Sequence, residues 1–301
     1  MHASSQKSSN IGMKMKKIII NVAKTLYSVI RAVKNCGNDK FLQLDNLTKK
    51  DLCVLGNGPS LNHNLINNID FITSRVSICV NDFISSDFFY TIKPSYYLLL
   101  DPAYWRHDSI SEYIEIRNSI FNRLNQNVDW CLTIIIPSIG KKELDWESIF
   151  DQNKNLKVAF INTTPISGYE CVRHFLYKYQ FGMPHAQNVL VAALFIGINL
   201  GFKNIFLLGA DHSWHEELFV NNDNVACMKD RHFYDNGEVK GVPFPMYHDS
   251  SEIPKLHIIF DAFAKMFEGY HYIENYANYR GVQIYNASNK SYIDAFKRCA
   301  I

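Results

Sequence analysis

The sequence predicts an α/β fold with a Rossmann-like, mostly parallel sheet and helices on both faces. Three observations lead to this prediction. The segment Asp51–Leu61, DLCVLGNGPSL, is typical of a buried strand, a tight turn with two glycines and the start of a helix. Short apolar segments alternate with helical patterns after it. Several of these segments are apolar throughout rather than alternating, which indicates parallel strands buried on both faces.

The turn after the first strand is the strongest local signal. Gly56 and Gly58 permit positive φ angles and close approach of a ligand to the backbone, while Pro59 can start the next helix and Ser60 can cap it. At the carboxyl edge of a parallel sheet, such a turn directs N–H groups at a ligand and favours phosphate. Asn57 adds an amide that can bind a sugar or a base. The turn lacks both the GxGxxG pattern and the lysine of a P-loop.

Residues 1–50 precede this strand and have a different character. Residues 1–11 are rich in Ser and Asn and are expected to be disordered, whereas 12–35 show apolar residues at helical spacing. The first 50 residues hold ten Lys/Arg and two Asp, a net charge of +8, which leaves −6 for the other 251. A basic amphipathic helix can lie on an anionic membrane surface, or it can pack on its own domain or on a second subunit. The sequence leaves these alternatives open.

Residues 51–301 are expected to form one nucleotide-sugar-binding domain. Strands are predicted over 76–80, 96–100, 130–136, 158–161, 204–208 and 282–285, and helices over 110–125, 185–200, 252–268 and 291–299. Gly201 is placed to end the second of these helices. The segment 212–247 contains a long irregular stretch rich in aromatic residues, which predicts a lid over the site.

Polar residues follow several of the predicted strands. Asn57, Asn81 and Asp101 follow the first three, and Gly209 and Asp211 follow the strand over 204–208. Ligands of open α/β sheets bind at the carboxyl ends of the strands. We therefore expect these residues to line a ligand site.

Composition limits the class of protein. With 301 residues and 47% apolar side chains, the chain can bury a full core. Seven scattered cysteines without a CxxC pair argue against a disulfide framework or a zinc ribbon and fit a reducing cytoplasm. Neither a membrane span nor a signal peptide is expected, because no apolar run reaches 18 residues and basic residues interrupt the N-terminal apolar ones. Nucleic-acid binding is not expected, since the excess of basic residues is confined to the first 50. These features predict a cytoplasmic protein, with a peripheral position on the inner membrane and homo-oligomerisation left open.

The GNGPSL segment resembles the first motif of the bacterial lipooligosaccharide sialyltransferases, glycosyltransferase family 42. A looser G-x-G-P-S-L also marks the motility-associated flagellin glycosyltransferases and a family similar to 6-hydroxymethylpterin diphosphokinase. The resemblance to family 42 continues in the same order through SICVND, ALFIGINLGFKNIFLLGAD, YHDSSEIPKLH and GVQIYNASNKSYIDAF. It therefore extends from about residue 50 to the end of the chain.

The resemblance to family 42 implies a variant of the GT-A fold, CMP-sialic acid as the donor and no required metal ion. It further implies that Asn57, Gly58 and Asn81 contact the CMP moiety, and that Asn188 and Gly209 line the same pocket. With these residues as the donor site, the expected substrates are a nucleotide sugar and a glycan or glycolipid acceptor.

The same resemblance implies that His248 is the general base, since a neutral imidazole can take the proton of an acceptor hydroxyl. Two departures leave the donor sugar open among sialic acid, Kdo and similar acids. Ser213 and Trp214 replace the tyrosines that bind the donor phosphate in the family, and Asp101 replaces an asparagine. The phosphate would then need another partner, for which the candidates are His212, His215, Arg231 and Tyr234.

Three alternatives remain. An enzyme similar to the diphosphokinases would use ATP and Mg²⁺, with Asp101 and Asp211 as ligands of the ion. Asp211, His212, His215 and Glu216 are ligand-type residues that could hold Zn or Mn, although the sequence contains no D-x-D motif. The third alternative is a nucleotide-binding protein that has no catalytic activity.

Overall fold

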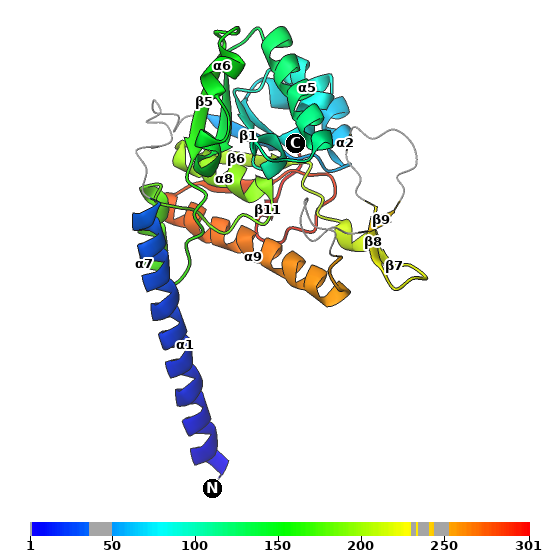
Figure 1. Ribbon diagram of the computed structural model, residues 1–301. Coiled ribbons are helices and arrows are strands. Elements are labelled where there is room, and N and C mark those ends of the chain that lie inside the picture. Colours follow the sequence, from blue (N-terminus) through cyan, green and yellow to red (C-terminus); the bar gives the residue numbers. More distant parts are fainter. Residues whose placement is uncertain (1, 36–49, 230–232, 234–240, 244–252) are drawn as a thin grey trace.

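The centre of the molecule is an eight-stranded sheet in which all paired strands are parallel (Figure 1). The computed structural model describes residues 2–35, 50–229, 233, 241–243 and 253–301, with side chains from residue 14 on. The strand order is β11-β10-β6-β1-β2-β3-β4-β5. The strands are β1 (Asp51–Leu55), β2 (Val76–Val80), β3 (Tyr96–Leu98), β4 (Leu132–Pro137), β5 (Leu156–Ile161), β6 (Asn204–Leu208), β10 (Gln283–Asn286) and β11 (Lys297–Arg298). The predicted parallel α/β sheet is confirmed.

Helices cover both faces of this sheet. One face carries α2 (Leu61–Asn67), α3 (Ile69–Thr73), α4 (Phe88–Ile92), α5 (Ser111–Asn127) and α6 (Trp146–Phe150). The other face carries α7 (Glu170–Lys178), α8 (Val189–Asn199) and α9 (Leu256–Arg280). The strands divide their side chains between two cores: Val54 points to the α8 side, whereas Cys53 and Leu55 point to the α2 side. This alternation is why the strands are apolar throughout.

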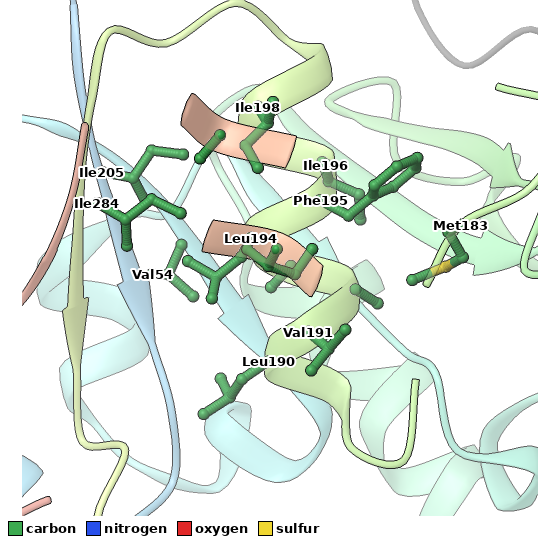
Figure 2. Close-up of a cluster of buried hydrophobic side chains, with 14 of the residues drawn as sticks. Val54, Met183, Leu190, Val191, Leu194, Phe195, Ile196, Ile198, Ile205 and Ile284 are labelled. Carbon is green, nitrogen blue, oxygen red and sulfur yellow. The ribbon is translucent and has the colours of Figure 1, made fainter. Parts of the chain in front are cut away.

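Helix α8 lies at the middle of the larger core (Figure 2). Every residue from Leu190 to Ile198 is buried, and the side chains of Val54, Ile205 and Ile284 from three strands lie on the side of α8 that faces the sheet. A helix that is apolar on all sides is expected only where it is enclosed by other elements. Its N-terminus therefore has a fixed position at the carboxyl edge of the sheet.

Three of the predicted helices need correction. The helix predicted over 185–200 begins only at Val189, and the helix predicted over 252–268 continues to Arg280, where Gly281 ends it with a φ of +70°. The helix predicted over 291–299 is wrong, because this segment is extended and contains β11. Its polar side chains bond to backbone groups: Ser291 Oγ donates to the carbonyl of Ala210 at 2.6 Å. Such bonds compete with helix formation.

The N-terminal and lid segments also differ from expectation. Helix α1 (His2–Lys34) begins at His2, so the disorder predicted for 1–11 is wrong; a helix extends more easily than it starts. The segment 212–247 contains a small antiparallel sheet of β7 (Leu218–Val220), β8 (Ala226–Met228) and β9 (Val242–Pro243). No helix in the described part of the chain is long and apolar enough to cross a membrane.

Candidate functional site

The sheet reverses its direction of growth between β1 and β6. From β1 the chain adds β2, β3, β4 and β5 on one side, and then returns to place β6 and β10 on the other. Open α/β sheets bind ligands outside the carboxyl ends of the strands at such a reversal. The loops after β1 and β6, which carry Gly56–Ser60 and Gly209–His212, meet at this point.

The two loops bond to each other through the glycine turn. The N–H of Gly56 donates to the carbonyl of Leu208, and the N–H of Gly58 donates to the carbonyl of Gly209, both at 2.9 Å. A Cβ atom at Gly58 would lie 2.7 Å from that carbonyl oxygen and 2.6 Å from Asp211 Oδ1. Neither Gly56 nor Gly58 uses the positive φ that glycine permits. Both residues must be glycine because the chain's own β6 loop approaches their backbone.

The side chain of Asp211 accepts hydrogen bonds from Ser60, directly before α2. Its Oδ2 accepts the N–H of Ser60 at 2.9 Å, and its Oδ1 accepts the Ser60 hydroxyl in a very short bond. The predicted capping of α2 by Ser60 is therefore wrong, because the hydroxyl is bonded to Asp211 and the helix begins at Leu61 without a side-chain cap. Burial raises the pKa of Asp211, and the bonds from Ser60 oppose that rise. Asp211 therefore accepts one of the N–H groups that the sequence analysis assigned to a ligand phosphate, together with the hydroxyl that it assigned to the helix cap.

Amide side chains next to this turn retain unused bonding capacity. Asn57 Nδ2 donates to the carbonyl of Val80 at 3.2 Å, while Asn57 Oδ1 is buried without a partner among the described residues. Asn81, at the end of the adjacent strand β2, also has a buried Oδ1 without a partner there. Its backbone is left-handed, with a φ of +46°, and its carbonyl accepts the hydroxyl of the buried Tyr97. Two acceptors on neighbouring strands are thus buried and unused.

Asn188 supplies an unused donor at the start of α8. Its Oδ1 caps the helix by accepting the N–H groups of Leu190 at 2.9 Å and Val191 at 3.3 Å. Its Nδ2 is buried and has no partner in the described chain. A Cβ at Gly56 would lie 3.1 Å from Leu190 Cδ1, which places this helix start against the glycine turn. The start of α8, which Asn188 caps, therefore lies beside the glycine turn, and the ligand contact of Asn188 stays a prediction.

A buried chain of hydrogen bonds continues from Asn188. The Tyr270 hydroxyl donates to Asn188 Oδ1 at 3.1 Å and lies 2.5 Å from His212 Nε2. Burial lowers the pKa of His212 to about 3 and raises that of Tyr270. His212 is therefore neutral at physiological pH. The sequence does not identify Tyr270 as a residue near the candidate site, because Tyr270 occupies an ordinary apolar position of α9.

The remaining predicted residues lie in separate environments. Asp101 Oδ1 accepts the N–H of Ala103 at 2.9 Å in the loop after β3. Trp214, in the place of a family tyrosine, stacks on His212 with ring centroids 4.7 Å apart. His215 packs edge-on against Tyr292. Ligand contacts of these residues stay predictions.

The metal site suggested for the segment from Asp211 to Glu216 finds no support in the described residues. No group of three or more His, Cys, Asp or Glu among them could hold an ion. Asp211 bonds to Ser60, His212 lies beside Tyr270, and Glu216 pairs with Lys290 at 2.5 Å. Their side chains are thus committed to different partners.

Part of the lid lies outside the described residues, including His248, Arg231 and Tyr234. The one described aromatic between 230 and 240 is Phe233, which is buried against Phe83 with ring centroids 5.0 Å apart. Its N–H donates to the carbonyl of Asn57 at 3.0 Å. The segment predicted as a lid therefore contacts the glycine turn.

Comparison with known proteins relates this chain to one of the families that its glycine motif resembles. A family model described as 6-hydroxymethylpterin diphosphokinase MptE-like matches residues 27–217. No curated protein matches the sequence. Among solved structures, the MAf glycosyltransferase from Magnetospirillum magneticum AMB-1 is similar, with 14% identity and a TM-score of 0.49. That similarity covers 90% of this chain and 37% of the other, so this chain spans well under half of its length.

Membership of glycosyltransferase family 42 is not shown by these comparisons. The family match covers well over half of the chain, and it includes the glycine turn, both strand-end asparagines and the loop after β6. The chain belongs to the MptE-like family.

Proposed function

We propose that the protein is a glycosyltransferase that moves a CMP-activated nonulosonic acid, such as sialic acid or Kdo, to a hydroxyl of a bacterial surface glycan. One observation carries this proposal: three amide groups at the reversal point of the sheet, on Asn57, Asn81 and Asn188, each have a buried polar atom without a described partner. A buried polar atom without a partner costs about 1–3 kcal/mol. A ligand that bonds to these atoms recovers that free energy.

The chemistry of these atoms matches a cytidine nucleotide. The Oδ1 atoms of Asn57 and Asn81 are acceptors, and cytosine offers an amino group while ribose offers hydroxyl donors. Asn188 Nδ2 is a donor, and the cytosine carbonyl or the phosphate can accept from it. A nucleotide bound by amides in this way requires no metal ion.

The phosphate site differs from the one that the turn suggests. Because Gly56, Gly58 and Ser60 donate to the β6 loop, their N–H groups are already used. The start of α8 lies beside the turn, and the positive end of its dipole favours an anion. We therefore place the donor phosphate near Asn188 rather than in the turn itself.

His248 remains our proposed general base. In the proposed step, its imidazole accepts the proton of the acceptor hydroxyl as that oxygen bonds to the anomeric carbon. The bond from that carbon to the phosphate oxygen breaks, and CMP leaves with the bonding electrons.

The family match supports a second candidate, an ATP-dependent diphosphokinase. In that reading Asp101 and Asp211 would share a magnesium ion. They follow β3 and β6, which are separated by β1 and β2 in the sheet. Three strand spacings correspond to about 14 Å at the level of the strands, which is too far for one ion. This separation argues against Asp101 and Asp211 as ligands of one magnesium ion.

Nucleotide binding decides between the two candidates. Calorimetric titration with CMP, UMP, GMP and ATP, each with and without Mg²⁺, should show binding of CMP that is independent of metal. Asn57→Ala and Asn81→Ala should each weaken CMP binding about tenfold, and Asn127→Ala, on the exposed face of α5, should leave it unchanged.

Binding of ATP only with Mg²⁺, together with release of AMP in the presence of 6-hydroxymethylpterin, would instead establish the diphosphokinase. CMP binding without any transfer from CMP-sialic acid or CMP-Kdo would indicate a nucleotide-binding protein. His248→Ala should abolish transfer and leave CMP binding nearly intact, and retained turnover would remove His248 as the base.

A further inference from the structure

Helix α1 packs on the domain through an unusual face. Its buried or half-buried residues are Asn21, Thr25, Ser28, Arg31 and Ala32; all of them except Arg31 recur at three- to four-residue spacing and are small or polar. Ser28 and Ala32 are almost completely buried, at 0% and 2% exposure. The side of α1 that faces the protein is therefore not its apolar side.

Hydrogen bonds fix this contact. Thr25 Oγ1 accepts the N–H of Tyr169 at 2.8 Å, and Ser28 Oγ accepts the N–H of Ser167 at 2.9 Å. A Cβ at Gly168 would lie 2.1 Å from Thr25 Oγ1, so the glycine permits this close approach. The C-terminal half of α1 is thereby held in a defined orientation on the domain.

Helix α1 extends far beyond the domain (Figure 1), and its apolar residues are exposed. We define the apolar face of α1 as eight residues at helical spacing: Met15, Ile18, Ile19, Val22, Leu26, Val29, Ile30 and Val33. Each is exposed, from 37% at Val29 to 72% at Val33. On a helical projection these residues cover about a third of the circumference. An apolar surface of this length requires a partner.

The charges of α1 identify that partner. The helix carries Lys14, Lys16, Lys17, Lys24, Arg31 and Lys34 within its described side chains, and His2–Lys34 contains no Asp or Glu. Lys17, Lys24 and Arg31 recur every seven residues on the side opposite the apolar face, and Lys16 lies at its border. This arrangement is that of a helix lying in the headgroup region of a bilayer.

A second copy of the chain fits less well. Met15, Ile19, Val22, Leu26, Val29 and Val33 do follow a heptad spacing. The α1 of a second copy contains no Asp or Glu and so offers no acidic partner to these cations, whereas anionic lipids supply the opposite charge. Ile18 and Ile30 also widen the face beyond a coiled-coil seam. We propose that α1 binds the surface of an anionic lipid bilayer through its apolar face and so orients the domain at the membrane.

Vesicle flotation of the full-length protein tests this inference without reference to the enzymatic proposal. The protein should float with vesicles of phosphatidylcholine containing about 30% phosphatidylglycerol, and much less with phosphatidylcholine alone. The double variant Ile19→Glu/Leu26→Glu should lose binding, because it places two charges on the apolar face. The triple variant Lys16→Gln/Lys17→Gln/Lys24→Gln should bind roughly 100-fold more weakly, and binding of the native chain should decrease with salt.

The matched control is Ile66→Glu/Ile139→Glu, which adds the same charge at two exposed residues outside α1. It should bind like the native chain, and circular dichroism should show that all variants are folded. Equal binding of the α1 double variant and the native chain would overturn the proposal. Absence of vesicle binding would also overturn the proposal. If the native chain then proved to be an oligomer that Ile19→Glu/Leu26→Glu dissociates, a second copy of the chain would be the partner of the apolar face.

Discussion

At the scale of single residues, the glycine turn is shaped by the protein's own chain. Gly58 lies under the Gly209 carbonyl and beside the Asp211 carboxylate, and Asp211 in turn accepts the donors of Ser60. Both loops at the reversal point are thereby locked together before any ligand arrives. Among the described residues around the turn, Asn57, Asn81 and Asn188 each keep a buried polar atom without a partner.

Gly58→Ala should destabilise the protein by about 2–3 kcal/mol, because the new methyl group meets a backbone oxygen at 2.7 Å. Gly269→Ala in α9 is the matched control: its Cβ would meet Val191 Cγ2 at 3.4 Å, an ordinary contact. Alanine is the better helix former there, so this variant should be about as stable as the native protein or more so. The urea midpoint followed by circular dichroism measures both, and a Gly58→Ala midpoint equal to the native one would contradict the close contact.

His212 makes stability depend on pH. Its folded pKa of about 3 lies below the value of 6.5 that applies to the unfolded chain, so the folded state binds fewer protons. The stability due to neutral His212 is fully present above about pH 6.5 and is lost as the pH falls towards 3. His212→Asn removes this titration and suits the φ of +52° at this position.

Urea midpoints between pH 4 and 7.5 should therefore decrease less for His212→Asn than for the native protein. His63→Asn, at an exposed position of α2, serves as the control and should follow the native curve. Parallel decreases in the native protein and His212→Asn would show that another group causes the acid sensitivity.

At the scale of elements, α8 connects the core to the candidate site. Its apolar residues fix the helix in the sheet, and Asn188 at its start both caps it and retains a buried Nδ2. The oxygen of Asn188 thus stabilises the helix, and its nitrogen is proposed to bind the ligand.

Two substitutions separate these roles. Asn188→Ala removes the cap and the acceptor for Tyr270, so it should cost about 1–2 kcal/mol of stability and also weaken CMP binding. Asn188→Asp keeps an oxygen at the cap and should retain most of the stability, but it should weaken CMP binding at least tenfold by placing a carboxylate near the phosphate. Thermal unfolding and calorimetric titration measure the two effects. Undiminished CMP affinity in Asn188→Asp would remove this residue from the site.

The sequence predicts the strands because each is a short apolar segment with turn residues after it. It predicts the positions of Asn57 and Asn81 at the ends of adjacent strands for the same reason. It does not predict the contact of Tyr270 with His212, which are 58 positions apart, because pairing across the fold leaves no local pattern. The prediction ends α9 at Glu268, because Gly269, a poor helix former, follows that position; Tyr270, Ile273 and Tyr276 nevertheless continue the helical spacing of buried residues to Arg280.

At the scale of the whole molecule, α1 joins the domain through a small area. Its contact consists of Thr25, Ser28, Ala32 and neighbouring residues against the segment before α7. Every described side chain of α1 before residue 21 is exposed. The two halves of the helix should therefore contribute differently to the stability of the domain.

Deletion of residues 2–20 should leave the melting temperature of the domain within about 2 °C of the native value, because it removes no buried contact in the described part of α1. Deletion of residues 2–35 should lower it by about 5–10 °C. The larger deletion removes the acceptors for the N–H groups of Ser167 and Tyr169 and uncovers the apolar surface under Ala32, together worth about 2–3 kcal/mol. Thermal unfolding by circular dichroism measures both values, and the double substitution Thr25→Val/Ser28→Ala should reproduce much of the larger loss in the intact chain. Equal melting temperatures for the two deletions would contradict the docking of α1 on the domain, and vesicle binding would then no longer orient the active site.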